Sequence, residues 1–220
     1  MTTIWYIGDS TVARNNINSY PQTGMSQGLS LYLKEAVRIE SLAKNGRSTK
    51  SFLDEGRFAP AEAGMRPGDF LLIQFGHNDE KPDEARHTDP DTTFRENLTL
   101  FVNAAKKAGA YPVLITPIAR RLFDEKGVFL PGSHGAYPGA VKATAEEAGV
   151  PVIDLTSATE DYLALLGDEA SKPLFVWPKD NTHLKPEGAV KMAGFLAQGL
   201  YDLGKPYSDL LASPDEGADK

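Results

Sequence analysis

Five short apolar runs, separated by stretches with helical periodicity, constrain the fold of this chain more than any other feature. The runs are rich in Ile, Val, Leu and aromatic residues and are bounded by Gly, Pro or Asp. Because apolar residues occupy consecutive positions, the runs are typical of strands covered on both faces. They lie at 3–8, 37–43, 69–76, 111–117 and 150–155.

Helical stretches follow the first, third and fourth runs, and one more lies near the end of the chain. The second of them ends in Lys106, Lys107 and Gly109, which is the cation placement and glycine capping that helix C-termini favour. Strands that alternate with helices predict a doubly wound, flavodoxin-like α/β fold with a five-stranded parallel sheet. The helical stretches cover 24–36, 92–109, 137–149 and 185–204.

Length and charge limit the organisation of the chain and its partners. With 220 residues and no break in composition, we expect one domain over 1–212 and a disordered tail over 213–220. The net charge of -7 and the lack of a Lys/Arg cluster argue against a nucleic-acid partner. Cysteine is absent, which excludes disulfides, thiolate catalysis and cysteine-bound metals.

The sequence shows neither a membrane-spanning segment nor the features of a signal peptide, and this bears on localisation. No apolar run approaches the roughly 20 residues needed to cross a bilayer, so we expect no membrane partner. Residues 1–10 lead into a strand without a basic segment, an apolar segment or a cleavage site. A cytoplasmic location is therefore expected, although a secreted chain that had lost its leader would look the same.

Polar residues with glycine follow the first three strands. They are Gly8-Asp9-Ser10, Asn45-Gly46-Arg47 and Gly76-His77-Asn78-Asp79. Ligands of doubly wound sheets bind at the carboxyl ends of the strands, so these turns should converge there. A loop with Asp180 and His183 precedes the last helical stretch and can approach the same edge.

These residue types suit acyl transfer. A serine hydroxyl becomes a good nucleophile when a histidine takes its proton, and a carboxylate orients that histidine. Ser10, His183 and Asp180 can supply these three groups. The backbone N–H groups of Ser10 and Gly46 and the amide of Asn78 can supply the oxyanion hole.

The four histidines can be compared as candidate bases. His183 has Asp180 three residues before it, between apolar segments that can order the turn. His87 has Glu84 at the same spacing and is the rival, but its surroundings are strongly charged and typical of a solvated loop. His183 is therefore the better candidate. The other two histidines, which have no acid at that spacing, are His77 and His134.

Each motif also has an ordinary structural explanation. Gly8-Asp9-Ser10 can be a turn and helix cap, and Asn45-Gly46 is a common turn dipeptide. Asp180 can cap the last helix, with His183 packed beside it at the surface. Taken singly, each motif favours the ordinary explanation. Four suitable segments at the expected places favour an active site.

These four segments, in this order and over nearly the whole chain, resemble the conserved blocks of the SGNH (GDSL-type) hydrolases. The resemblance implies a three-layer α/β/α fold with Ser10 as nucleophile, His183 as base and Asp180 as its orienting acid. It also implies Ser10, Gly46 and Asn78 as oxyanion donors. It implies no metal and no cofactor.

Within that superfamily, the chain is similar to the rhamnogalacturonan acetylesterases, a carbohydrate esterase family. The similarity lies in "GDSTVA", "NGRSTKSF", "FGHND", "TPIARRLF" and "DNTHLKPEGA". Thr11 stands where the wider group has leucine, a change that leaves the catalytic roles intact because none of them uses this side chain. The resemblance implies an acetylated pectic carbohydrate as substrate and hydrolysis through an acetyl-serine intermediate.

Such a substrate carries uronate carboxylates, and arginines after the second and fourth strands could bind them. Arg47, Arg120 and Arg121 are the candidates, with solvated loop residues as the equal alternative. His77 follows a strand directly and can line the cleft. Trp177 can stack on a sugar or pack beneath the loop, and packing is favoured.

Other functions stay open at this point. Members of the superfamily with other specificities act on xylan, lipids and thioesters, and their motifs around the acyl centre look alike. A flavodoxin-like sheet could also bind a nucleotide, but no G-x-G-x-x-G or Walker A pattern follows a strand. A non-catalytic sugar-binding domain would have no use for His183 beside Asp180.

Overall fold

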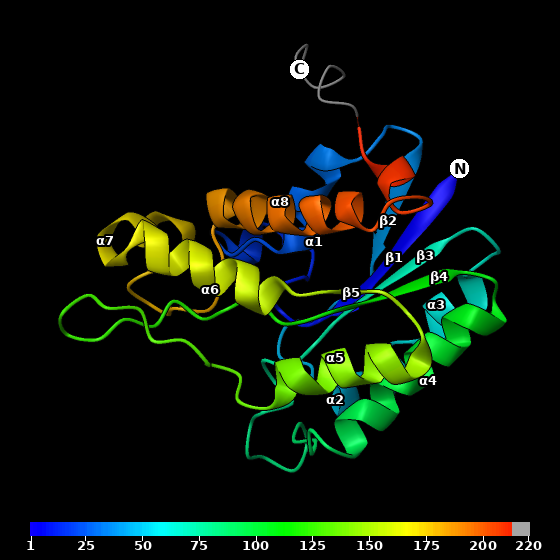
Figure 1. Ribbon diagram of the computed structural model, residues 1–220, viewed down its shortest axis with the longest axis horizontal. Coiled ribbons are helices and arrows are strands. Elements are labelled where there is room, and N and C mark those ends of the chain that lie inside the picture. Colours follow the sequence, from blue (N-terminus) through cyan, green and yellow to red (C-terminus); the bar gives the residue numbers. More distant parts are fainter. Residues whose placement is uncertain (213–220) are drawn as a thin grey trace.

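The predicted five-stranded parallel sheet is confirmed. The computed structural model describes residues 1–212, so the expected disorder at 213–220 lies outside the described residues. All strand pairs are parallel, and the strand order is β2-β1-β3-β4-β5 (Figure 1). The strands are β1 (Thr2–Gly8), β2 (Val37–Ser41), β3 (Phe70–Gln74), β4 (Tyr111–Ile115) and β5 (Val152–Ile153).

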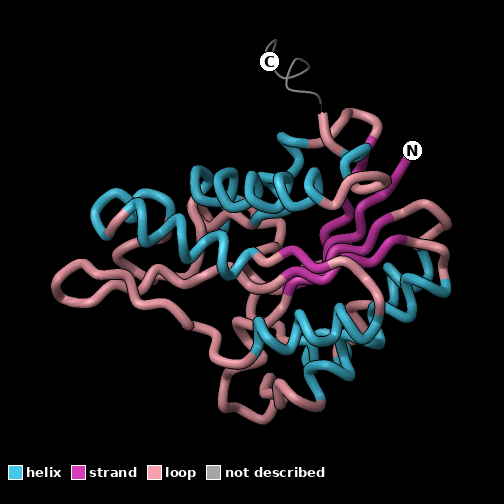
Figure 2. Tube along the Cα trace, in the orientation of Figure 1, coloured by secondary structure: helices cyan, strands magenta, loops and turns pink. Residues whose placement is uncertain are grey.

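Helices cover both faces of the sheet and complete the three layers expected of the fold (Figure 2). One face carries α1 (Met25–Leu29), α6 (Leu155–Leu166), α7 (Asp168–Ser171) and α8 (Pro186–Asp202). The other carries α2 (Thr49–Asp54), α3 (Ala59–Gly64), α4 (Thr93–Lys107) and α5 (Tyr137–Ala148). Short 3-10 turns lie at Ile17–Ser19, Ser30–Tyr32, Lys172–Leu174 and Ser208–Leu210.

Successive strand residues pack into two separate cores, because side chains of a strand point alternately to opposite faces of the sheet. In β1, Tyr6 packs with α1 and α8, whereas Ile7 packs with α2 and α4. In β3, Leu72 and Ile73 divide between the same two cores. This double burial explains why the strands are apolar on consecutive positions.

Two parts of the helix prediction need correction. The stretch 24–36 is helical only over Met25–Leu29, followed by a 3-10 turn to Tyr32, because Leu33 is extended and pairs with Leu211. Four helices, α2, α3, α6 and α7, were not predicted. Of these, α2 and α3 are six residues long and α7 is four residues long, too short for a clear period. A local signal for α2 is its cap, Ser48, whose side chain accepts a hydrogen bond from the Ser51 N–H.

α6 has a clearer signal in the sequence, at both of its ends. Asp154 caps it by accepting from the Ser157 N–H, and Gly167 follows its last residue. β5 is also shorter than its predicted range, with only two paired residues.

The strand order places a crevice above β1 and β3. The chain crosses from β1 to β2 on one side and then to β3 on the other, so the loops after these neighbouring strands diverge. The loops after β1, β2 and β3 carry the candidate site residues. Among the described helices, none is both long enough and apolar enough to cross a lipid bilayer.

Candidate active site

The structure brings Ser10, His183 and Asp180 into one chain of hydrogen bonds. His183 Nε2 lies 3.0 Å from Ser10 Oγ, and His183 Nδ1 lies 3.1 Å from Asp180 Oδ2. Ser10 comes two residues after β1, whereas His183 comes three residues before α8, 173 positions further along the chain. This is the geometry of a nucleophile, a general base and the acid that orients the base.

Asp180 holds its own loop in shape while it contacts His183. Its Oδ1 accepts hydrogen bonds from the backbone N–H groups of Thr182, at 2.9 Å, and His183, at 2.7 Å. Partial burial opposes ionisation, but these N–H donors and the His183 ring outweigh it, so the pKa of Asp180 is lowered. Asp180 is therefore a carboxylate at neutral pH, as the orienting role requires.

The loop that carries His183 is anchored on both sides. The Val176 N–H donates to the His183 carbonyl at 2.8 Å, and Phe175 forms an antiparallel bridge with Leu184. Pro186 then begins α8, a position that suits proline because no helix hydrogen bond is lost there. The imidazole is thus held by ordered backbone.

The turn that carries Ser10 is built by its neighbours. The buried Asp9 accepts hydrogen bonds from the Thr11 N–H at 2.9 Å and the Thr11 hydroxyl at 2.8 Å. Gly8 allows the close approach of β3, since a Cβ there would lie 2.5 Å from the Gln74 carbonyl oxygen. Burial raises the pKa of Asp9, against the effect of the Thr11 hydrogen bonds. Asp9 shapes the turn, and the acid bound to His183 is Asp180.

The three predicted oxyanion donors surround the same pocket. Within the described residues, the backbone N–H groups of Ser10 and Gly46 have no hydrogen-bond acceptor. Gly46 has φ +77°, a backbone conformation that glycine adopts without strain. Asn78 Nδ2 donates one hydrogen to the Arg47 carbonyl at 3.2 Å, and its second hydrogen stays available. Arg86 Nη1 lies 3.4 Å from Asn78 Oδ1 and fixes which end of the amide is the donor.

These groups line a pocket of about 500 Å³. It lies at the carboxyl ends of β1 and β3 and between the loop after β2 and the loop before α8, where the fold predicts a ligand. Its lining residues are Ser10, Gln22, Asn45, Gly46, His77, Asn78, Lys81, Arg86, Arg120, Asp180, Thr182 and His183.

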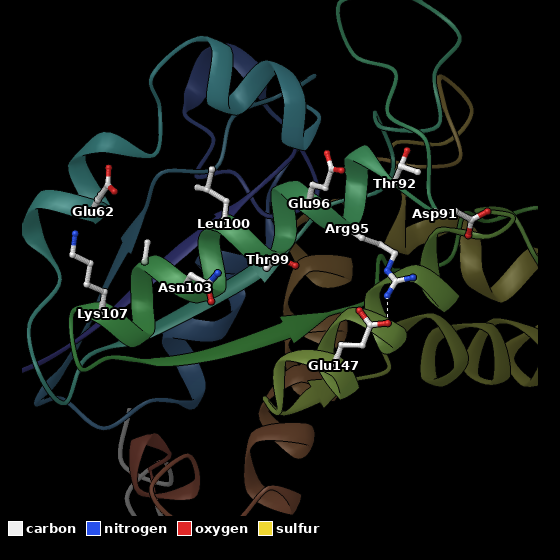
Figure 3. A pocket seen from close by; sticks show the side chains of 11 residues that line it. Glu62, Asp91, Thr92, Arg95, Glu96, Thr99, Leu100, Asn103, Lys107 and Glu147 are labelled. Carbon is white, nitrogen blue, oxygen red and sulfur yellow. Dashed lines mark ion pairs between the residues drawn. The ribbon is translucent and has the colours of Figure 1, made fainter.

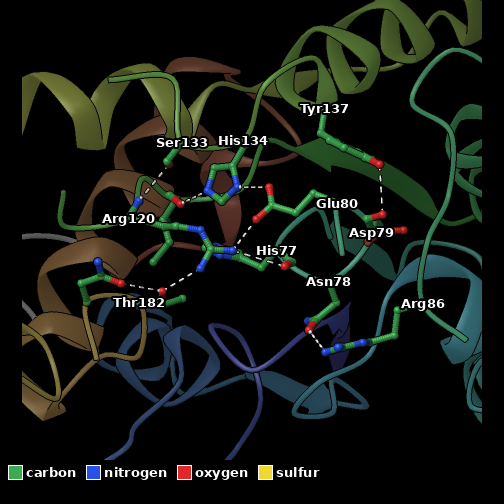
Figure 4. A network of polar contacts seen from close by, with 12 residues as sticks. His77, Asn78, Asp79, Glu80, Arg86, Arg120, Ser133, His134, Tyr137 and Thr182 are labelled. Carbon is green, nitrogen blue, oxygen red and sulfur yellow. Dashed lines mark hydrogen bonds and ion pairs between the residues drawn. The ribbon is translucent and has the colours of Figure 1, made fainter. Parts of the chain in front are cut away.

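Arg120 lines this pocket, but its guanidinium contacts other groups of the protein (Figure 4). It forms an ion pair with Glu80 and donates to the Thr182 hydroxyl at 2.8 Å and the His77 carbonyl at 3.3 Å. Arg120 thereby ties the loop after β3 to the loop of His183. The structure supports a positioning role for Arg120 more than the predicted contact with substrate.

His134 completes this network. Its Nδ1 lies 3.0 Å from a Glu80 carboxylate oxygen, and its Nε2 lies 2.8 Å from the Ile118 carbonyl oxygen (Figure 4). Partial burial opposes ionisation of Glu80, but His134 and Arg120 outweigh it, so the pKa of Glu80 is lowered. Glu80 is 54 residues from His134, which explains why local spacing gave no sign of this pair.

His77 lies where the sequence predicts, in the wall of the pocket. It is 3% exposed, and neither ring nitrogen has a hydrogen-bond partner among the described residues. Burial, with the nearby cationic groups, lowers the pKa of His77 well below its usual value. The ring is therefore neutral, with one donor and one acceptor nitrogen.

The other predicted substrate contacts do not face the pocket. Arg47 forms an ion pair with Glu55 at 3.1 Å and donates to the Asn45 carbonyl at 2.8 Å. Arg121 is buried in an ion pair with Asp168. Neither arginine lines the pocket that holds Ser10.

Trp177 is also away from the pocket. Its ring packs against the Arg121 guanidinium at 4.6 Å from the ring centroid, which is the packing alternative favoured from the sequence. The indole is 41% exposed and lines a neighbouring surface hollow with Arg121 and Phe123.

The rival pair does not approach Ser10. His87 is exposed, and its Nδ1 faces the Lys81 carbonyl oxygen at 3.1 Å. Glu84 is exposed as well, and neither residue lines the pocket. Of the two histidines with an acid at this spacing, only His183 contacts the serine.

Sequence reasoning missed pocket residues in two segments. Lys81 and Arg86 lie in the charged stretch that looked solvated, and Gln22 lies before α1. The only sequence signal for the first two was their closeness to Asn78. Nothing in the sequence marks Gln22.

A wider hollow lies elsewhere on the molecule. It has a volume of about 740 Å³, lies along α4 and is crossed by the ion pair between Arg95 and Glu147 (Figure 3). It is mostly lined by exposed polar side chains and holds no serine or histidine. Over residues 1–212, no three His, Asp or Glu side chains are grouped as metal ligands.

Comparison with known proteins places the chain in a family. Residues 6–190 match the model of the GDSL-like lipase/acylhydrolase family. The chain is 41% identical to rhamnogalacturonan acetylesterase RhgT of Bacillus subtilis (strain 168), over 96% of this chain and 94% of that protein. It is 37% identical to the probable rhamnogalacturonan acetylesterase YesY of the same strain, over 94% and 95% of the two chains.

A solved structure has the same fold. The crystal structure of the Bacillus subtilis protein YxiM superposes with a TM-score of 0.83 at 27% identity. The superposition covers 93% of this chain but only 57% of the YxiM chain. The family model covers most of the chain, including the turn of Ser10 and the loop of His183, and the chain belongs to the GDSL-like lipase/acylhydrolase family.

Proposed function

We propose that this protein is a carbohydrate esterase that removes O-acetyl groups from rhamnogalacturonan or its oligosaccharides. The observation that carries the hydrolytic part is the hydrogen-bonded chain from Ser10 through His183 to Asp180. The similarity, over nearly the whole chain, to one protein named a rhamnogalacturonan acetylesterase and one named a probable rhamnogalacturonan acetylesterase supports the substrate class.

The first half of the reaction transfers the acetyl group to the enzyme. Ser10 Oγ attacks the acetyl carbonyl carbon while His183 Nε2 takes the hydroxyl proton. The oxyanion binds the N–H groups of Ser10 and Gly46 and the amide of Asn78. The C–O bond to the sugar then breaks, and His183 returns the proton to the leaving sugar oxygen.

The second half releases acetate. A water molecule gives its proton to His183 and attacks the acetyl carbon of the acyl-serine, which regenerates the oxyanion in the same donors. Collapse of this intermediate breaks the bond to Ser10 Oγ, and His183 reprotonates that oxygen. Asp180 stays ionised and stabilises the imidazolium in both halves.

Acetate release from a panel of acetylated oligosaccharides tests the proposal. The panel contains rhamnogalacturonan and xylan oligosaccharides with matched acetyl content, and purified Ser10→Ala is the control. We expect the highest kcat/KM on the rhamnogalacturonan oligosaccharides and a loss of about 10⁴-fold in kcat in the variant.

Other results would redirect the proposal. A preference for acetylated xylan, lipid esters or thioesters would replace the substrate class and leave the acyl-enzyme mechanism in place. Binding of sugar or nucleotide without hydrolysis of any ester would contradict the esterase itself.

A further inference from the structure

The charged groups of the active-site pocket are paired within the protein, with one exception. Arg120 pairs with Glu80, Arg86 pairs with Asp83, and Asp180 contacts His183. Lys81 lines the same pocket, and its ammonium has no ion-pair partner over residues 1–212. Lys81 is therefore the one lysine or arginine side chain of the pocket that contacts no carboxylate of residues 1–212, in a chain whose net charge is -7.

Backbone contacts hold Lys81 in the wall of this pocket. Its N–H donates to the Asn78 carbonyl at 3.1 Å, and its own carbonyl oxygen faces His87 Nδ1 at 3.1 Å. The residue is thus fixed three positions after the oxyanion donor Asn78, and its side chain is half-buried. An ammonium on this anchored backbone can meet a substrate bound at Ser10.

Residues that line the same pocket also carry buried polar atoms without hydrogen-bond partners. Gln22 Nε2, Asn45 Oδ1 and both ring nitrogens of His77 are buried without a hydrogen-bond partner in the described part of the chain. Buried polar groups without partners are costly, so such groups in a pocket point to a ligand or water that supplies the missing bonds. Sugar hydroxyls supply both donors and acceptors.

We propose that Lys81 binds the carboxylate of a uronic acid residue in the acetylated sugar chain, so that the pocket distinguishes anionic from neutral oligosaccharides. This inference rests on the proposed function and deepens it. It also replaces the arginines predicted from the sequence, because Arg47, Arg120 and Arg121 are committed to carboxylates of the protein. An ammonium suits this role as a point charge that tolerates several carboxylate orientations.

Oligosaccharide binding tests the inference without requiring hydrolysis. Calorimetry compares deacetylated rhamnogalacturonan oligosaccharides with the same oligosaccharides after carboxyl reduction, which makes them neutral. For Lys81→Gln we expect Kd to rise about tenfold on the charged ligand and to change little on the neutral one. Lys81→Arg keeps the charge and should retain most of the affinity for the charged ligand.

Lys126→Gln is the matched control, because it removes one positive charge from an exposed loop outside the pocket. It should bind both ligands as the wild type does. Equal effects of Lys81→Gln on the two ligands, or no binding of either ligand by the wild type, would overturn the role of Lys81.

Acetate release from the acetylated oligosaccharides is measured on the same proteins and tests the proposed function separately. Charge-dependent binding without acetate release would support Lys81 while contradicting the esterase. Acetate release with equal affinity for the two ligands would support the esterase and contradict the role of Lys81.

Discussion

His183 and His134 each have a carboxylate at Nδ1, but their surroundings differ. Each holds a carboxylate oxygen near Nδ1, at 3.1 Å from Asp180 for His183 and at 3.0 Å from Glu80 for His134. The His183 side chain is 33% exposed in the pocket, whereas that of His134 is fully buried. A histidine–carboxylate pair alone therefore does not identify a catalytic base.

The two histidines also differ in the group that contacts their second ring nitrogen, Nε2. Nε2 of His183 faces the Ser10 hydroxyl at 3.0 Å, a group that can give up its proton. Nε2 of His134 faces the Ile118 carbonyl oxygen at 2.8 Å, which can only accept. His134 must donate there, so it cannot remove a proton from a substrate or a nucleophile. Its contacts lock the loops after β3 and β4 together.

Replacing His183 should have the largest effect on catalysis. His183→Ala removes the proton acceptor of Ser10, and we expect kcat on an acetyl ester to fall about 10⁴-fold. The side chain is partly exposed, so the free energy of unfolding should change by no more than about 0.5 kcal/mol. Steady-state kinetics and urea unfolding of the same preparation measure both effects. A variant that keeps a tenth of the activity would exclude His183 as the base.

His134→Ala should show the opposite pattern. It leaves the Glu80 carboxylate and the Ile118 carbonyl oxygen without their buried partner, which should lower the free energy of unfolding by about 3 kcal/mol. We expect a smaller loss of kcat than for His183→Ala, because the triad itself stays complete. Unchanged stability in urea with kcat reduced as in His183→Ala would reverse the two assignments.

Glu80→Gln should change how the stability of the protein depends on pH. The folded pKa of Glu80 is lowered, so its ionised form contributes stability above its unfolded pKa, and this contribution is lost as the pH falls through the folded pKa. The variant should therefore lose less unfolding free energy than the wild type when the pH falls from about 7 to about 3. Urea unfolding at several pH values measures the two slopes. Parallel slopes would mean that Glu80 is not held by His134 and Arg120.

The smallest effect should come from the pair that matches Asp180 and His183 only in sequence spacing. Glu84 and His87 are both exposed and outside the pocket. The double variant Glu84→Ala/His87→Ala should keep kcat and KM within about twofold of the wild type, as expected of surface substitutions. A loss near that of His183→Ala would move the base to this pair.

The sheet and the contact between Asp180 and His183 could be predicted because both leave local signals in the sequence. Strands buried on both faces are apolar on consecutive positions, as in Phe70–Gln74. The candidate residues come directly after strands or before a helix, where the fold gathers them. Asp180 and His183 are three residues apart, so their pairing could be predicted from a single turn.

The roles of the long charged side chains could not be predicted in this way. Arg120 and Arg121 are neighbours after β4, but their partners Glu80 and Asp168 are 40 and 47 residues away in opposite directions along the chain. The stretch with Lys81 looked solvated because its composition is charged, although backbone contacts hold Lys81 beside Asn78. Tertiary contacts decide whether such a cation faces a ligand or a carboxylate of the protein.

The central claim is that Ser10 carries the acyl group, and covalent labelling tests it most directly. The wild type is treated with a fluorophosphonate, which modifies serines activated by a general base, and the labelled peptide is identified by mass spectrometry. We predict labelling of Ser10 in step with loss of esterase activity, and none in His183→Ala. Loss of activity with the label on another residue, or labelling of Ser10 that does not depend on His183, would contradict the account.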